Sequence, residues 1–281
     1  MFFCANAHST LFNEQGVALK AKRYKKPDVN WVRVDKKSVP STRLMYSGVG
    51  TLRYAQCNGF FIDQGAGDQA PAYFITAGHC IKKDPNSSRV DTRYDGKLGP
   101  EDLVIDKDYL ENIHFLNGKK KGSIRIKKIK LATRRKRDFA ILESKKSVGE
   151  VKQYATPFEL YDGIELFEEQ TIVIPNFPIS VDSNHLYIST CQILKAPKLR
   201  KVSIKSEKDN GLFFYETFPH RCSILPGSSG SPALDEQTGR VIGVSSSQVS
   251  THNYTSQLSK LYNCFDESGI WNHQQTDCPL K

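Results

Sequence analysis

Short apolar or alternating runs, broken by Gly, Asp, Asn and Pro, recur along the chain from about Ser41. Runs of this length between turn residues are typical of β-strands, and no long stretch has the 3.6-residue period of an amphipathic helix. Strands at this spacing predict an all-β barrel or sandwich. The runs are residues 59–62, 73–76, 124–126, 139–142, 170–174, 186–188, 211–215 and 241–244.

Composition and charge exclude several classes of protein. Of the 281 residues, 38% are hydrophobic, which is enough for a packed core and excludes a disordered chain. No apolar run approaches the length of a transmembrane helix, so we expect no transmembrane segment. The net charge of +10 is local, because eleven of the 40 Lys and Arg lie in residues 119–137 without an acid. The other 29 nearly balance the 30 Asp and Glu.

The basic stretch, residues 119–137, has two interpretations. It is either a solvated, mobile loop or a patch that attracts phosphates, anionic membrane surfaces or acidic proteins. No zinc-finger, RNA-recognition or phosphate-loop signature accompanies it. A general coat of charge for nucleic acid is therefore not indicated, and the partner that the stretch implies is an acidic surface.

Seven cysteines and an unusual N-terminus bear on the cellular compartment. No two cysteines have the CxxC spacing of a structural zinc site, so we expect no metal. Residues 1–7, MFFCANA, resemble the end of an export signal with an Ala-x-Ala cleavage site. The charged start of such a signal is missing, which a misassigned start codon or a chance match would explain. Cleavage after Ala7 would remove Cys4 and leave six cysteines, an even number suited to an extracellular or periplasmic protein. Spacing alone leaves all 15 pairings of six cysteines open.

Three short segments carry candidate catalytic side chains. In T-A-G-H-C at residues 76–80, His79 follows an apolar run and small residues, which predicts a place at the exposed end of a strand. In G-S-S-G-S-P at residues 227–232, the glycines around Ser229 let the backbone turn tightly, so that N–H groups can point at one spot beside the hydroxyl. A serine nucleophile with an oxyanion hole requires that arrangement. Asp138 immediately precedes a third apolar run.

Together these segments resemble the three motifs of chymotrypsin-like serine proteases. The segment at residues 76–80 is similar to the motif T-A-[AG]-H-C, and D-F-A-I-L at residues 138–142 is similar to D-[IFL]-A-[LI]-L. The segment at residues 227–232 is similar to G-[DN]-S-G-[GS]-P, and its G-x-S-G-S-P form is that of the bacterial glutamyl-endopeptidase-like branch. The order is that of chymotrypsin, with 59 residues from His79 to Asp138 and 91 from there to Ser229. Each segment alone is compatible with an ordinary loop or turn, but their order and spacing make the resemblance specific. It covers roughly residues 41–250.

The resemblance implies an all-β fold of two packed six-stranded Greek-key β-barrels, with the active site at their interface. It implies a secreted serine endopeptidase that acts through an acyl-enzyme, with Ser229 as nucleophile, His79 as general base and Asp138 orienting the imidazole. The N–H groups of Gly227 and Ser229 would form the oxyanion hole. No cofactor is implied, the substrate is a protein or peptide, and we expect a monomer.

The same resemblance divides the chain and pairs its cysteines. One disulfide closes the histidine loop, one ties the strand before the nucleophile loop to a neighbour, and one lies in the tail. The implied pairs are Cys57–Cys80, Cys191–Cys222 and Cys264–Cys278. The expected segments are 1–7 (signal-peptide remnant), 8–40 (polar, basic N-terminal extension or pro-segment), 41–150 (first barrel, with the His and Asp), 151–250 (second barrel, with the Ser) and 251–281 (C-terminal extension).

Two features depart from the family pattern. Ser228 stands where animal digestive enzymes carry an Asp that pairs with a freed N-terminal amine, and a hydroxyl cannot form that ion pair. We therefore expect an oxyanion hole that is preformed. The expected specificity pocket, Ser223, Ile224 and Ser245, contains no charge, and Ser245 stands where glutamyl-specific relatives carry a His. A charged P1 side chain would lose its hydration without a partner, so small or medium uncharged P1 residues are predicted.

Two other functions are compatible with the sequence. One is a catalytically silent binding protein on a protease fold, since a fold does not fix function. The other is a protein that binds polyanions or surfaces through the basic stretch. Labelling of Ser229 by a fluorophosphonate discriminates the enzyme from both.

Overall fold

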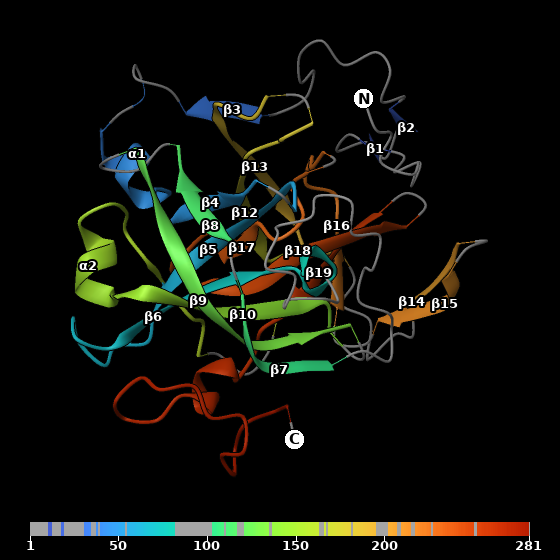
Figure 1. The fold of residues 1–281 in the computed structure, drawn as a ribbon. Helices are drawn as coiled ribbons and strands as arrows, with labels where there is room; N and C mark the ends of the chain where they lie inside the picture. The colour runs from blue at the N-terminus through green and yellow to red at the C-terminus, as the bar shows by residue number, and fades with distance from the viewer. Residues whose placement is uncertain are drawn as a thin grey trace, which may run out of the picture.

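The protein is built from two large β-sheets with little helix (Figure 1). The computed structural model describes residues 11–12, 18–19, 31–34, 38, 40–53, 55–81, 103–109, 111–116, 121–134, 137–162, 166, 168–180, 182–194, 202–206, 209–214, 217–225, 227–249 and 252–280. Only the backbone is described for residues 11–12, 18–19, 31, 202–206, 209–214, 247–249 and 252.

The first sheet closes into a six-stranded antiparallel barrel. Pairing of β10 with both β6 and β9 closes the ring, β7 extends the sheet beyond β9, and β11 (Phe158–Glu159) pairs in parallel with β5. The strands in spatial order are β10 (Phe139–Ser147), β6 (Pro71–Thr76), β5 (Cys57–Asp63), β4 (Val49–Leu52), β8 (Asn112–Phe115), β9 (Gly122–Thr133) and β7 (Leu103–Asp108).

The second sheet has seven strands and curves back on itself to form the second barrel. An isolated bridge between Ile193 and His220 joins the chain just after β13 to the end of β16. The strands in spatial order are β16 (Thr217–His220), β19 (His252–Gln257), β18 (Val241–Val249), β17 (Pro232–Asp235), β12 (Thr171–Asn176), β13 (Leu186–Gln192) and β3 (Trp31–Val34). The mostly β fold with two packed sheets confirms the predicted fold class.

The remaining elements are short. Two small hairpins join β1 (Leu11–Phe12) to β2 (Ala18–Leu19) and β14 (Val202–Ser206) to β15 (Asp209–Phe214). The helices are α1 (Pro40–Met45), α2 (Val148–Lys152) and the 3-10 turns η2 (Gly78–Cys80) and η3 (Leu261–Cys264). None of these helices in the described part of the chain has the length and apolar character needed to cross a bilayer.

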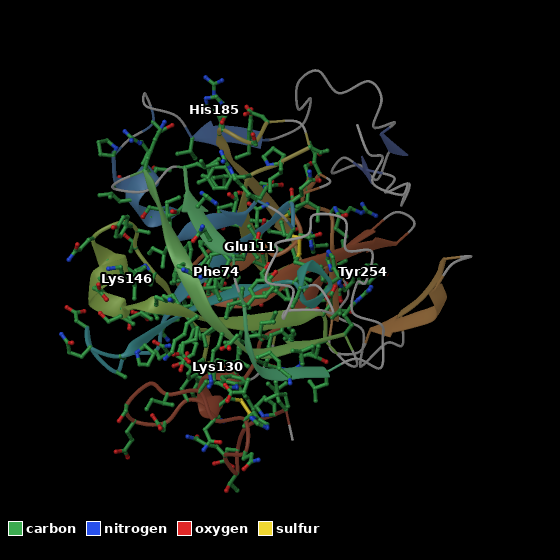
Figure 2. All side chains as sticks on the ribbon, viewed as in Figure 1. Phe74, Glu111, Lys130, Lys146, His185 and Tyr254 are labelled. Carbon is green, nitrogen blue, oxygen red and sulfur yellow. A yellow bond between two sulfur atoms is a disulfide. The ribbon has the colours of Figure 1, made fainter. Side chains whose placement is uncertain are left out.

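The central strands of the first barrel are buried on both faces because each face packs into a different core. Side chains of a strand alternate between its two faces. Phe61 and Phe74 accordingly fill the inside of the first barrel, and Figure 2 labels Phe74 there. Their neighbours Phe60 and Ile75 pack in a core that reaches Phe177, directly after β12 of the second sheet. The apolar runs of these strands are therefore continuous, and one core joins the two sheets.

Three segments differ from the sequence predictions, which gave a strand in the basic stretch only over residues 124–126. β9 covers most of the basic stretch, so the interpretation as a mobile loop is wrong. Its cations are partly neutralised, because Lys127 Nζ lies 2.6 Å from Glu143 and Lys130 Nζ lies 2.9 Å from Asp106. β3 lies within the expected N-terminal extension, and β19 lies beyond residue 250, the expected end of the second barrel.

After β19 the tail crosses back to the first barrel (Figure 1). The main-chain N–H of Trp271 donates to the hydroxyl of Tyr73 on β6 at 2.9 Å. Phe265 packs its ring against both Tyr73 and Trp271. The tail therefore adds contacts that hold the two sheets together.

Candidate active site

His79 lies in the 3-10 turn η2, directly after strand β6. The turn packs tightly against β9, because a side chain at Gly78 would come within 2.1 Å of the Thr133 carbonyl oxygen. The next residue, Cys80, forms a disulfide with Cys57 at the start of β5. Packing and the disulfide fix the main chain on both sides of His79, whose side chain is 20% exposed.

Asp138 is fully buried immediately before β10, the strand that pairs with β6. Its Oδ2 lies 2.7 Å from His79 Nδ1, and its Oδ1 accepts the main-chain N–H of His79 at 2.8 Å. Its own N–H donates to Ser256 Oγ of the second sheet at 3.0 Å. The fold thus joins two candidate residues that are 59 positions apart in the sequence.

Electrostatics favour the ionised form of this buried carboxyl. Burial of Asp138 disfavours its charged form. Attraction to His79, the hydrogen bonds that His79 donates and the nearby Arg134, whose Nε lies 4.0 Å from Oδ1, outweigh burial and hold the pKa of Asp138 below its ordinary value. An ionised carboxylate can only accept hydrogen bonds. His79 Nδ1 therefore carries the donated proton, which leaves Nε2 as the acceptor nitrogen.

Ser229 lies in a loop held by hydrogen bonds from both sheets. The N–H of Asn58 on β5 donates to the Ser229 carbonyl at 2.7 Å, and the N–H of Gly230 donates to the Ser245 carbonyl on β18 at 2.7 Å. Gly230 has a φ of +89°, and a Cβ there would lie 2.0 Å from the Asn58 carbonyl oxygen. Only glycine suits this position, and the half-buried Ser229 next to it lies where the two sheets meet.

Within the described residues, no hydrogen bond joins the Ser229 hydroxyl to the His79 imidazole. Their two segments nevertheless lie side by side. Thr76, three residues before His79, donates its hydroxyl to the Asn58 carbonyl at 2.6 Å, and the same carbonyl lies against Gly230. The structure therefore joins His79 to Asp138 and packs the Ser229 loop against the strand that leads to the histidine.

Gly227, one of the two candidate oxyanion residues, lies in a tight turn that ends just before Ser229, the other. The N–H of Ser228 donates to the Leu225 carbonyl at 2.9 Å, and Gly227, the third residue, has the positive φ of +91° that a type II turn requires. A Cβ at Gly227 would come within 2.9 Å of the Ile179 side chain. Ser228 is fully buried, and its hydroxyl donates to Asn176 Oδ1 at 2.8 Å. A neutral hydrogen bond thus occupies the position of the activating Asp in digestive enzymes.

The residues predicted for the specificity pocket are all buried in the second barrel. Ser223 and Ile224 precede the turn at Gly227, and Ser245 lies on β18. The main-chain N–H of Ser245 donates to the Ser231 carbonyl at 2.8 Å, which fixes β18 against the Ser229 loop. Among the described residues, the Ser245 hydroxyl is buried without a hydrogen-bond partner.

Six cysteines form three disulfides, in the pairs that the family resemblance implied. They are Cys57–Cys80, Cys191–Cys222 and Cys264–Cys278. His79 and His220 each lie near one disulfide, with the potential ligand atoms of each group within 4.8 Å of one another. Sulfur atoms in disulfides offer no thiolate, so neither group is prepared to hold a metal ion. Cys4 and the expected signal remnant lie outside the described residues.

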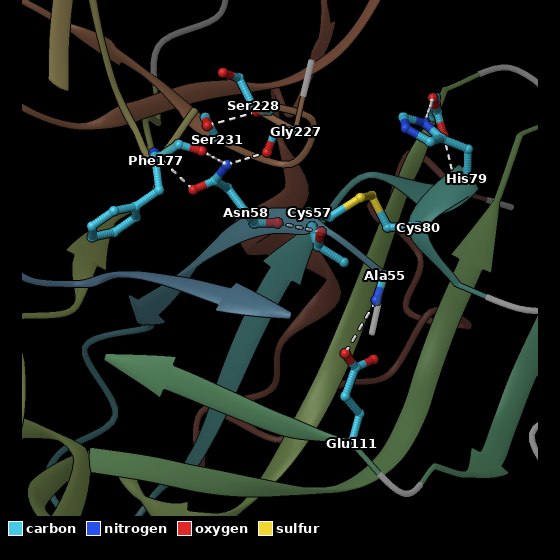
Figure 3. Close-up of a disulfide and its surroundings, with 12 residues drawn as sticks. Ala55, Cys57, Asn58, His79, Cys80, Glu111, Phe177, Gly227, Ser228 and Ser231 are labelled. Carbon is cyan, nitrogen blue, oxygen red and sulfur yellow. Dashed lines mark hydrogen bonds and ion pairs between the residues drawn. A yellow bond between two sulfur atoms is a disulfide. The ribbon is translucent and has the colours of Figure 1, made fainter. Parts of the chain in front are cut away.

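Sequence reasoning missed the buried polar residues that connect these loops, namely Asn58, Asn176 and Ser256. The Asn58 side chain lies between Phe177 and Gly227, beside the disulfide of the histidine loop (Figure 3). An amide directly before the apolar run of residues 59–62 was the only local signal for Asn58. No local pattern distinguishes Ser256.

Comparisons with known proteins agree with this geometry. A family model described as "Trypsin-like peptidase domain" matches residues 57–244, more than half of the chain. The fold is similar to that of a Glu endopeptidase in complex with MPD, with 15% identity, 84% of this chain and 94% of that chain covered, and a TM-score of 0.51. For Vibrio cholerae VesB protease the identity is 14%, 83% of this chain and 64% of that chain are covered, and the TM-score is 0.48. A search of curated proteins gave no match. The chain therefore belongs to the trypsin-like peptidase family, the chymotrypsin/trypsin-like serine proteases.

Proposed function

We propose that the protein is a secreted serine endopeptidase that hydrolyses peptide bonds through an acyl-enzyme. Ser229 is the nucleophile, His79 the general base and then acid, and Asp138 the residue that orients the imidazole. The observation that carries the proposal is the 2.7 Å contact between the buried Asp138 carboxylate and His79 Nδ1. Membership of the trypsin-like peptidase family gives this pair its chemical context.

The nitrogen of the His79 imidazole that carries the proton determines the chemistry. Because Asp138 accepts the Nδ1 proton, the lone pair of His79 is on Nε2 and takes the Ser229 proton as Oγ attacks the scissile carbonyl carbon. Collapse of the tetrahedral intermediate breaks the C–N bond, and His79 gives the proton to the leaving amine. Water then attacks the acyl ester by the same route, which restores the serine hydroxyl and releases the acid.

The contact between Ser229 and His79 is proposed to form when substrate binds. Catalytic hydrogen bonds are often long or poorly aligned in free enzymes and tighten in the complex. The main chain of Ser229 is already fixed by Asn58, and that of His79 by the Cys57–Cys80 disulfide. The proposal is that rotation about the Cα–Cβ bond of the serine completes the contact.

The oxyanion hole is proposed to consist of the Gly227 and Ser229 N–H groups and to be preformed. The positive φ of Gly227 and the buried hydrogen bond from Ser228 to Asn176 support this, since neither depends on a new N-terminal amine. Full-length and N-terminally trimmed protein should therefore hydrolyse a small ester at similar rates. A difference of orders of magnitude between them would refute a preformed hole.

The specificity pocket is proposed to accept small or medium uncharged P1 side chains. The pocket residues Ser223, Ile224 and Ser245 bring hydroxyl and apolar groups but no charge. A charged P1 group would be desolvated without an opposite charge, which is costly. Cleavage profiling on a peptide library tests this, and dominant cleavage after Glu, Lys or Arg would contradict it.

The proposal includes secretion of the protein and, as a candidate partner of the basic stretch, an acidic surface. Three disulfides suit an extracellular or periplasmic compartment, where they persist. The pairing of Lys127 and Lys130 with acids on neighbouring strands reduces the charge that β9 offers to a polyanion. Binding through the basic stretch is therefore secondary to the peptidase function.

Labelling with a fluorophosphonate tests the peptidase proposal directly. We expect wild-type protein to be labelled and Ser229→Ala and His79→Ala to remain unlabelled, with losses on the order of 10⁶ in kcat for either residue. Wild-type protein that is folded yet neither labelled nor active on any peptide would refute the proposal. Binding to a polyanion that weakens steeply with salt would then support the surface-binding function.

A further inference from the structure

We propose that Asn58 is a positioning residue for the oxyanion hole, holding from the first barrel both residues that supply its N–H donors. This inference rests on the proposed peptidase function and names a residue that acts through Gly227 and Ser229. The Asn58 side chain is completely buried, and its hydrogen bonds reach both Phe177 and Gly227 (Figure 3).

The carboxamide of Asn58 joins two segments of the second barrel. Its Nδ2 donates to the Gly227 carbonyl and, at 2.8 Å, to the Phe177 carbonyl. Its Oδ1 accepts the Phe177 N–H at 2.9 Å. Both donors and the acceptor are thus used by main-chain groups, and the side chain is fully buried.

The main chain of Asn58 holds the neighbouring position of the same loop. Its N–H donates to the Ser229 carbonyl at 2.7 Å. Its own carbonyl accepts the Thr76 hydroxyl at 2.6 Å, on the strand that leads to His79. One residue therefore holds the carbonyls of both Gly227 and Ser229. Each carbonyl lies in the peptide plane that follows its residue, one Cα away from the plane that carries the N–H of the same residue. Holding both carbonyls therefore restricts rotation of the Ser228–Ser229 peptide between them and of the peptide before Gly227.

A carboxamide is the side chain that satisfies this site. The Gly227 carbonyl needs a donor and the Phe177 N–H needs an acceptor, and an ionised Asp has no donor. A Leu fills a similar volume but leaves these two groups without partners, and it leaves the Phe177 carbonyl only the Ile179 N–H at 2.8 Å. Either substitution frees Gly227 to move, whereas the Asn58 main-chain bond to Ser229 is retained.

A second link holds the same turn from the other side. Ser228 Oγ donates to Asn176 Oδ1 at 2.8 Å, and Asn176 is the chain neighbour of Phe177. Asn58, Phe177, Asn176 and Ser228 therefore form a continuous path of neutral groups around Gly227. This path performs the locking that the family's digestive enzymes obtain from a buried ion pair.

The test compares Asn58→Leu and Asn58→Asp with wild-type protein by steady-state kinetics and by binding of a tetrahedral-state inhibitor. We expect kcat to fall about 10²-fold, the typical loss for one oxyanion donor, while KM changes little. A peptide boronic acid, which adopts the tetrahedral state, should lose affinity by the same factor as kcat/KM. The corresponding uncleavable peptide amide should bind as it does to wild-type protein.

Gln170→Met is the matched control. Gln170 is also a buried carboxamide, and its Nε2 donates to Asp235 Oδ1 at 3.0 Å. It lies directly before β12, whereas Asn176 lies at the other end of that strand. Six residues of strand separate these ends by about 20 Å. The control should lose stability as the Asn58 variants do and keep wild-type kcat per folded molecule.

Two results would overturn the inference. One is wild-type kcat and boronate affinity in folded Asn58→Leu; the other is an equal loss of kcat in Gln170→Met. If Asn58→Leu fails to fold, Asn58→Ser, which keeps one donor in a smaller side chain, provides the same comparison. Wild-type protein without labelling at Ser229 would instead refute the proposed function, so the two failures are distinguishable.

Discussion

Asp138→Asn is the sharpest test of the proposed mechanism, because the structure determines how an amide must sit in this site. The carboxylate accepts two hydrogen bonds from one residue, from His79 Nδ1 at 2.7 Å and from the His79 main-chain N–H at 2.8 Å. An Asn has one oxygen for these two donors, and its NH₂ group must face the other. The substitution hardly changes volume, so the packing around the site is preserved.

The main-chain N–H cannot change its role, whereas the imidazole can move its proton. With the Asn oxygen on the main-chain N–H of His79, the NH₂ group meets Nδ1, which must then become an acceptor. The proton moves to Nε2, the nitrogen that should take the Ser229 proton. The reverse orientation leaves a buried N–H without an acceptor, at a cost of about 1–3 kcal/mol.

We therefore expect kcat/KM to fall about 10⁴-fold in Asp138→Asn, as an Asp-to-Asn change does in the Ser-His-Asp triad. This equals about 5 kcal/mol of transition-state stabilisation. The assay is hydrolysis of a small ester and a peptide, with circular dichroism as evidence of folding. Asp235→Asn is the matched control, because Asp235 is a buried acid of the second barrel that bonds Gln170 and Thr238. Less than a tenfold loss in folded Asp138→Asn would refute the orienting role.

The same variant has a signature in stability against pH. The pKa of Asp138 lies below its ordinary value of 3.8, so its ionised form stabilises the fold above that pH. This contribution is lost as pH falls through the folded pKa. Wild-type protein should therefore lose stability more steeply in acid than Asp138→Asn, measured by denaturant unfolding between about pH 5 and 2. Parallel curves would contradict this assignment.

Three further substitutions test how the framework holds the site. Tyr73→Phe leaves the Trp271 N–H without its acceptor and should lower the free energy of unfolding by about 1–3 kcal/mol. Because burial raises the pKa of Tyr73 to about 12, the stability of wild-type protein should fall between pH 10 and 12. This fall should be smaller in the variant. Gly230→Ala sets a Cβ against the Asn58 carbonyl at a positive φ and should destabilise by at least about 2 kcal/mol in urea unfolding. Opening the C-terminal disulfide at Cys264, with a sequence separation of 14, should cost about 3 kcal/mol by thermal unfolding, and an unchanged Tm would contradict that.

Local sequence patterns were sufficient for the strands that contain the predicted apolar runs and for the pairing of two motif residues. The runs that contain Phe74 and Ile141 are short, apolar and bounded by turn residues, and both became central strands of the first barrel. The motif residues His79 and Asp138 were predicted as partners, and the structure joins them at 2.7 Å. Patterns of this kind are local because each strand must bury its own faces.

The basic stretch shows where a count of charges misleads. Its lysines and arginines are numerous, but the residues between them include Ile124, Ile126 and Ile129, all fully or almost fully buried. Alternation of buried and exposed positions predicts a strand even when the exposed positions are charged. Charge describes one face of β9, whereas the other face determines its structure.

The inter-barrel hydrogen bonds could not be predicted from the sequence at all. Asn58 bonds Phe177, 119 positions away, and Gly227, 169 positions away. Such partners depend on how the two sheets pack, which no pattern within one strand records. The only local trace is an amide in an apolar run, where burial of a polar group requires partners.

The position of Ser229 relative to His79 is therefore a property of the interface between the sheets. His79 and Asp138 belong to the first barrel and Ser229 to the second, so no single barrel contains the proposed triad. Phe60 and Phe177 belong to the one core that spans both sheets, and apolar burial of that kind resists separation but tolerates small sliding motions. Directional hydrogen bonds from Asn58 remove that freedom next to Ser229, which is why a buried carboxamide there is expected to control turnover as well as stability.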